Sequence, residues 1–173
     1  MMIKSNDKTV FRNLYEEVFS VLMKVAFHIT YNSDISEEIC QDAFMRFYDK
    51  EISFNTLDEA KFYLIRITKN LAINYLRKKM KEAAFTDAVN GVSEKDGASQ
   101  LIENESVVSV RKAVAKLPEN YKTVIVLREY ADLSYEEISS VLHISESNVK
   151  IRIYRARKAL EEVLSKEEVY VSG

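Results

Sequence analysis

Five cations and no acids lie between Asn148 and Leu160, in a stretch whose apolar residues recur at helical spacing. At about 100° per residue, one side of this helix is apolar. That side is formed by Val149, Ile153, Ala156 and Leu160. The side chains that could contact nucleic acid lie on the other side or at its edges: Ser147, Asn148, Lys150, Ile151, Arg152, Tyr154, Arg155 and Lys158. A helix that is buried on one side and cationic on the other can bind phosphates.

A short helix and a tight turn precede the cationic helix. Ser134 and Glu137 have the spacing of a capping box, which marks the start of the short helix, and Ser145 can cap the cationic helix in the same way. This arrangement is typical of a helix-turn-helix, whose second helix enters the major groove of DNA. A bundle helix with a solvated basic face would carry the same charges but would not need this spacing, so the pattern favours DNA binding.

The composition favours an all-α protein. The chain has only three glycines and one proline in 173 residues, and 47% of its residues are hydrophobic. Helical periodicity predicts three N-terminal helices, at 9–30, 35–50 and 59–80, with a loop at 51–58.

The charge distribution divides the chain. The net charge of -2 argues against nucleic acid, but residues 60–81 carry seven cations, whereas residues 82–106 carry six acids and one lysine. Local charge decides DNA contact. We expect two small helical domains: an N-terminal helical bundle at 1–81, an acidic linker at 82–105, a helix-turn-helix domain at 106–165 and a frayed tail at 166–173.

The C-terminal pattern is similar to a known family. Residues 134–160, SYEEISSVLHISESNVKIRIYRARKAL, resemble the C-terminal helix-turn-helix of extracytoplasmic-function (ECF) sigma factors of the sigma-70 family. The run Arg155 to Leu160 is the most specific match. His143 stands where the family has a turn glycine, and histidine tolerates a left-handed backbone better than most residues. Ser147-Asn148 and Ile151 also depart from the family pattern. The resemblance implies recognition of a promoter -35 element.

A second block, SDISEEICQDAFMRFYDK at residues 33–50, resembles region 2 of the same family. There the helix docks on the clamp helices of the largest catalytic subunit of core RNA polymerase. The matching positions, which the resemblance implies are polymerase-binding, are Glu38, Ile39, Gln41, Asp42 and Phe44. From spacing alone, the acidic side of this helix, which includes Glu38 and Asp42, favours a solvated helix face, and it is the resemblance that changes this interpretation.

The third predicted helix resembles the family segment that captures and unpairs the promoter -10 element. The resemblance and the residue chemistry together indicate the candidate contacts, which are Phe54, Tyr63, Asn70, Asn74, Arg77 and Lys78. Splaying a base out of a duplex costs a few kcal/mol, which stacking and base-edge hydrogen bonds recover. Tyr63 could as well be a core aromatic. Phe54 lies in a loop, which favours a functional role over a place in the core.

The sequence gives little support for catalysis, metal binding or a disulfide. Cys40 is the only cysteine, so no intrachain disulfide can form, and the two histidines, His28 and His143, are isolated. We therefore expect no catalytic residues, no metal site and no cofactor. The polar start of the chain and the lack of a long apolar run predict a cytoplasmic protein with no membrane insertion.

The two blocks, about 33–80 and 106–160, together predict an ECF-type sigma factor that binds core RNA polymerase and promoter DNA to initiate transcription. An anti-sigma factor is a usual partner in the family, although no residue here indicates one. One alternative is a free-standing helix-turn-helix regulator whose N-terminal domain senses a ligand or dimerises. Another is a helical adaptor that binds only protein. The region 2 resemblance argues against both.

Overall fold

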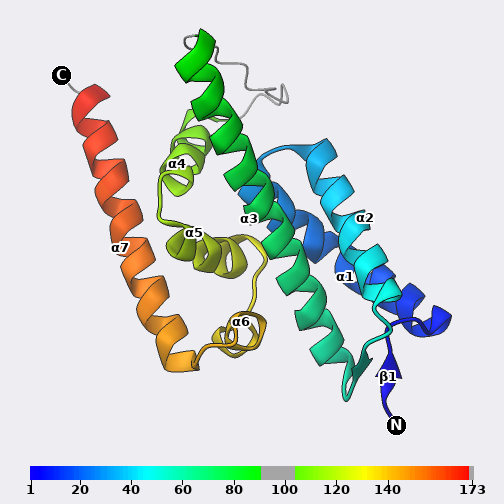
Figure 1. Cartoon of the computed structure of the whole chain (residues 1–173). Coiled ribbons are helices and arrows are strands. Elements are labelled where there is room, and N and C mark those ends of the chain that lie inside the picture. Colours follow the sequence, from blue (N-terminus) through cyan, green and yellow to red (C-terminus); the bar gives the residue numbers. More distant parts are fainter. Residues whose placement is uncertain (91–103, 172–173) are drawn as a thin grey trace. The chain divides into compact units, whose positions relative to one another are not determined.

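The computed structural model describes residues 1–90 and 104–171. The chain forms two compact units, an N-terminal unit, Met1–Ser99, and a C-terminal unit, Gln100–Gly173. Helices dominate both units, which confirms the predicted all-α class (Figure 1). Among the described residues, no helix is both long enough and apolar enough to span a membrane.

The N-terminal unit packs three helices together. Its elements are β1 (Ile3–Lys4), α1 (Lys8–Thr30), α2 (Ser33–Asp49), β2 (Ser53–Phe54) and α3 (Leu57–Asn90). Asp7 caps α1 by accepting hydrogen bonds from two backbone amides of the first turn, and Asn32 caps α2. Between them Tyr31 adopts a left-handed conformation, φ 51°, which ends α1 and reverses the chain.

The core of this unit comes from the apolar stripes that the periodicity predicts. All three helices contribute fully buried side chains, among them Leu14, Leu22, Val25, Phe47, Leu64 and Ala72. Burying such side chains removes a large apolar area from water, the main favourable contribution to folding. The three helices are thereby held with their polar sides outward.

A small antiparallel pair of strands, which was not predicted, ties the loop at 51–58 to the N-terminus. Ile3 pairs with Phe54, and Lys4 pairs with Ser53. The buried Ser5 extends the link, because its amide donates to the carbonyl of Ile52 (2.9 Å) and its Oγ accepts from the amide of Ile52 (2.9 Å). The loop before α3 therefore has a defined path.

The third helix is longer than predicted. It continues from the expected end at residue 80 to Asn90, and its C-terminal turns run beyond α1 and α2 (Figure 1). The acidic composition of 82–105 suggested a linker, but residues 81–90 contain lysine, glutamate and three alanines, with no glycine or proline. These are strong helix formers, so helix propensity explains the difference. Gly91 and Gly97, which also suggested the linker, lie outside the described residues.

The C-terminal unit contains the predicted helix-turn-helix. Its elements are α4 (Glu105–Ala115), α5 (Glu119–Ile125), the π-helical turn η1 (Val126–Tyr130), α6 (Tyr135–Leu142) and α7 (Glu146–Val171). Helices α4, α5 and α6 all pack on α7, and the core between them includes Val114, Ile125, Leu127, Ile138 and Ile153. The predicted tail at 166–173 is helical as far as Val171, and Ser172 and Gly173 lie outside the described residues.

Candidate nucleic-acid and polymerase interfaces

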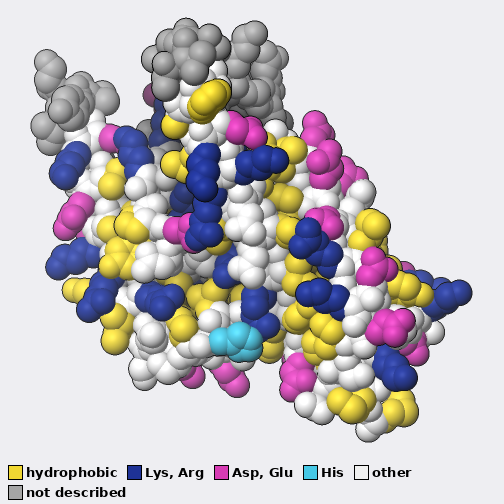
Figure 2. All heavy atoms as spheres, in the orientation of Figure 1, with side chains coloured by type: hydrophobic (Ala, Val, Ile, Leu, Met, Phe, Trp, Pro, Cys, Tyr) yellow, Lys and Arg dark blue, Asp and Glu magenta, His cyan; other side chains and the backbone are white. Residues whose placement is uncertain are grey.

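The orientation of α7 agrees with the sequence prediction. Val149, Ile153 and Ala156 are buried against the C-terminal unit. The opposite side, which we call the reading face, consists of Ser147, Asn148, Ile151, Tyr154, Arg155 and Lys158, with Lys150 and Arg152 at its edges. All of these side chains are exposed except Asn148 and Arg152, which are half-buried. Figure 2 shows Lys and Arg side chains along this helix with hydrophobic groups between them.

Local hydrogen bonds hold the turn that presents α7. In the capping box of α6, the amide of Glu137 donates to Ser134 Oγ (3.1 Å), and the amide of Ser134 donates to Glu137 Oε1 (3.4 Å). His143 ends α6 in the left-handed region, φ 53° and ψ 45°, as expected for a residue in the place of a turn glycine. Ser145 Oγ then accepts from the amide of Asn148 (3.1 Å). These local hydrogen bonds cap the start of both helices and fix the turn between them.

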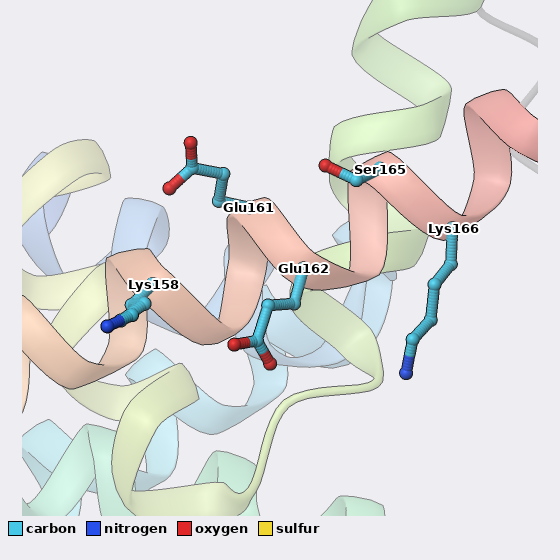
Figure 3. Close-up of a pocket in the computed structure, with 5 residues that line it drawn as sticks. All are labelled: Lys158, Glu161, Glu162, Ser165 and Lys166. Carbon is cyan, nitrogen blue, oxygen red and sulfur yellow. The ribbon is translucent and has the colours of Figure 1, made fainter.

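Two features limit the cationic part of α7. Arg157 is paired within the unit at its surface, since its Nε (3.1 Å) and Nη2 (2.6 Å) both donate to Glu129 Oε1 of η1. This hydrogen bond raises the pKa of Arg157 above its ordinary value. Beyond Lys158, acids begin, and Figure 3 shows Lys158, Glu161, Glu162, Ser165 and Lys166 around a surface hollow lined by α7 alone. The cationic part of α7 therefore ends near Lys158.

The polar residues predicted on α3 share one face. Tyr63, Asn70, Asn74 and Arg77 fall within about 40° of one line along the helix at 100° per residue. The asparagines, Arg77 and Lys78 are exposed, while Tyr63 is half-buried. We call Asn70, Asn74, Arg77 and Lys78 the capture face. It places amide groups beside cations, as recognition of a base and its phosphates requires.

Phe54 differs from its expected role as an exposed aromatic. Its side chain is only 7% exposed, its ring stacks on Phe47 (centroids 5.6 Å apart), and it lies 5.4 Å from the ring of Tyr63. The strand pairing with Ile3 turns this loop residue into the core. Phe54 therefore supports Tyr63 from beneath, and a DNA base could not stack on it without displacing it.

We expect Phe54→Ala to destabilise the N-terminal unit by about 3–5 kcal/mol, the usual cost of deleting a buried phenyl group. Hydrogen exchange of amides in residues 1–86 would measure the loss directly. The control is Phe54→Leu, which keeps most of the apolar volume and should cost under about 1.5 kcal/mol. Unchanged protection combined with weaker DNA binding would instead mean that the ring contacts DNA.

The candidate polymerase-binding residues on α2 separate into two groups. Glu38, Gln41 and Asp42 are on the polar side, where Asp42 Oδ1 accepts from Arg46 Nε (3.1 Å). Ile39 and Phe44 are buried, contrary to a direct contact role, because the helix turns them toward α1 and α3. Phe44, for example, lies against the ring of Phe11, with centroids 5.6 Å apart. These two residues position the helix, and its polar side remains available.

Sequence reasoning missed three exposed residues. Met45 is 63% exposed in the middle of the polar side of α2, one turn beyond Gln41 and two beyond Glu38. On α3, Lys81 and Phe85 extend the capture-face line, and Phe85 is 72% exposed. A helical projection would have identified Met45. The other two required knowing that α3 continues past residue 80. We define the docking face of α2 as Glu38, Gln41, Asp42 and Met45.

The remaining reactive groups are shielded. Cys40 is fully buried, and desolvation, followed by the nearby charge of Glu37, raises the pKa of its thiol to about 12. The thiol is thus protonated at neutral pH and unreactive. Among the described residues, no group of three His, Cys, Asp or Glu side chains is placed to hold a metal ion.

Two family models match the two units. The model of sigma-70 region 2 matches residues 14–82, and the model of sigma-70 region 4 matches residues 107–160. The first match contains the docking and capture faces, and the second contains the helix-turn-helix. Both regions are present in chain order, which defines a transcription initiation factor of the sigma-70 class.

Sequence identity to known proteins shows which kind of sigma-70 protein this chain is. The chain is 31% identical to the ECF RNA polymerase sigma factor SigW of Bacillus subtilis, over 94% of this chain and 92% of that protein. It is 30% identical to the ECF RNA polymerase sigma-E factor of Haemophilus influenzae, over 92% of this chain and 89% of that one. The chain belongs to the family of ECF RNA polymerase sigma factors.

Solved structures share the fold. One is the sigma factor RpoE of Bartonella quintana in complex with the anti-sigma factor NepR, with a TM-score of 0.65, 24% identity and coverage of 90% of this chain and 96% of that one. Another is CnrH in complex with the cytosolic domain of CnrY, with a TM-score of 0.62, 20% identity and coverage of 94% and 92%.

Proposed function

We propose that the docking face of α2 binds core RNA polymerase, on the clamp helices of its largest subunit, and that α7 and α3 then select the promoter. The reading face of α7 contacts the -35 element in the major groove. The capture face of α3, with Tyr63, holds an unpaired base of the -10 element. The chain acts with the polymerase on DNA in the cytoplasm and initiates transcription without catalytic residues of its own.

The observation that supports this assignment best is the exposure of three chemically different faces. The docking face is acidic around one methionine, the capture face combines amides with cations, and the reading face is cationic around apolar groups. An acidic face suits a cationic protein surface, whereas the other two suit nucleic acid. A free-standing regulator would need only a DNA-contacting face and a sensing surface, and would leave the capture face unexplained.

The sigma factor RpoE of Bartonella quintana, which was solved with a bound anti-sigma factor, supports a further part of the proposal. We propose that a protein inhibitor of the same kind binds this chain and keeps it from the polymerase. Such an inhibitor need only cover the docking face or the capture face to prevent initiation.

The direct test combines the purified chain, bacterial core RNA polymerase and a library of promoter fragments randomised at both elements. Each fragment carries a barcode in its transcribed part, so sequencing of the transcripts identifies the active fragments. These should share a motif in two parts, whose recovery depends on both proteins. If the chain instead protects a duplex site tightly without polymerase, and no transcripts form, it is a free-standing regulator.

Arg155→Ala should weaken promoter binding and reduce the slope of log affinity against log salt concentration by about 0.9, the value for one phosphate contact. The measurement is a salt titration of holoenzyme binding to promoter duplex. Arg157→Ala is the matched control, because Arg157 is engaged by Glu129 and should leave the slope unchanged. Equal slopes in wild type and Arg155→Ala would remove Arg155 from the interface.

A further inference from the structure

Ile151 is an exposed aliphatic residue at the centre of the reading face. It lies about 160° around the helix axis from both Val149 and Ile153, which are buried, at 100° per residue. Its side chain is 49% exposed. The fold therefore turns this isoleucine outward, and the core of the C-terminal unit does not account for it.

The residues around Ile151 can all form hydrogen bonds. Ser147 and Asn148 precede it by one turn, and Tyr154 and Arg155 follow it by one turn. Ile151 is the sixth residue of α7, within the first two turns. Recognition helices contact base edges mainly through their N-terminal residues, so this is the depth at which a side chain meets bases and not phosphates.

A branched aliphatic side chain has one good partner in the major groove. The edges of guanine, cytosine and adenine present donors and acceptors there, whereas thymine adds a C5 methyl group beside its O4 acceptor. An isoleucine packed on a donor or acceptor of a base would displace the water bound there without replacing its hydrogen bond, which is unfavourable. Against a methyl group it buries apolar surface from both partners.

We propose that Ile151 reads a thymine of the -35 element through its C5 methyl group. The inference rests on the proposed function, since it requires the reading face to lie in the major groove. Ser147, Asn148 and Arg155 surround the apolar contact and can bond to the bases beside this thymine. Ile151 departs from the family pattern, so the thymine preference belongs to this chain.

The test removes the methyl group without changing base pairing. Using the promoter recovered with holoenzyme, each thymine of the -35 element is replaced in turn by deoxyuridine. We expect one position at which this substitution weakens holoenzyme binding about fourfold, which corresponds to the roughly 0.8 kcal/mol of burying one methyl-sized group. The other positions should change little.

Ile151→Ser assigns the effect to the side chain. In this variant, deoxyuridine at the sensitive position should bind as well as thymine, while Ile151→Val should retain most of the wild-type difference. Because Ile151 is exposed, both variants should fold, and a change in their DNA binding cannot be attributed to unfolding. Three outcomes would each overturn the inference. The first is that deoxyuridine binds as well as thymine at every position, and the second is a recovered -35 motif that requires no thymine. The third is that Ile151→Ser loses as much affinity as the wild type does when deoxyuridine replaces the sensitive thymine. The proposed function fails separately, if no promoter is recovered with polymerase at all.

Discussion

Asp42→Arg should reduce the affinity of the chain for core RNA polymerase by at least tenfold. Asp42 lies on the docking face beside Glu38 and Gln41, and its carboxylate pairs with Arg46 at 3.1 Å. The substitution replaces an acid by a cation and places two cations one turn apart, so the local charge changes sign. Like charges brought together across an interface cost several kcal/mol, and tenfold requires only about 1.4 kcal/mol.

The loss should be specific to polymerase binding. The Asp42–Arg46 pair is exposed, with both side chains about half accessible, so its contribution to folding is small. Glu16→Arg is the matched control, because Glu16 is an exposed acid on α1 and not on α2. Binding of labelled variants to core polymerase would measure both. Full affinity in Asp42→Arg, or an equal loss in Glu16→Arg, would contradict docking through α2.

Met45 gives this interface a feature that charge alone does not provide. A methionine that is 63% exposed one turn beyond Gln41 supplies a flexible apolar contact at one end of the face. Interfaces commonly combine apolar contacts with polar ones. The acids would then select and orient a cationic partner, while Met45 contributes to the lifetime of the complex.

Asn70→Ala should slow promoter opening by about tenfold or more while leaving duplex binding nearly unchanged. Asn70 is exposed on the capture face, and an amide can form two hydrogen bonds with a base edge, worth about 1–3 kcal/mol. Those bonds are made only with the unpaired base, so losing them should slow the opening of the promoter and not its binding as a duplex. Fluorescence of 2-aminopurine placed in the -10 element would follow the rate.

The same substitution should slightly stabilise the protein. Alanine is a better helix former than asparagine by a few tenths of a kcal/mol, and Asn70 lies inside α3. A slower opening rate could then not be attributed to unfolding. Asn13→Ala, at an exposed position of α1, changes the helix in the same way and should open promoters normally. Normal opening by Asn70→Ala would exclude Asn70 from base capture.

The sequence determines which side of each helix is buried. The apolar spacing of α7 correctly separates Val149, Ile153 and Ala156 from the exposed side, because the angle between residues on a helix depends only on their separation. Capping residues such as Ser134 and Ser145 are also readable, since they bond to amides three residues away. The order of the two sigma regions follows from such local patterns.

Tertiary structure alone decides which of the candidate binding residues remain exposed and unpaired enough to contact DNA. Phe54 lies in a loop, and only the pairing with Ile3 and the stack on Phe47 bury it. Arg157 carries the same charge as Arg155, but Glu129, which is 28 residues away, engages it. Contacts between distant residues are not encoded in any local spacing, because they depend on how the elements pack. Burial of a loop aromatic and pairing of one arginine among several therefore became evident only in the folded chain.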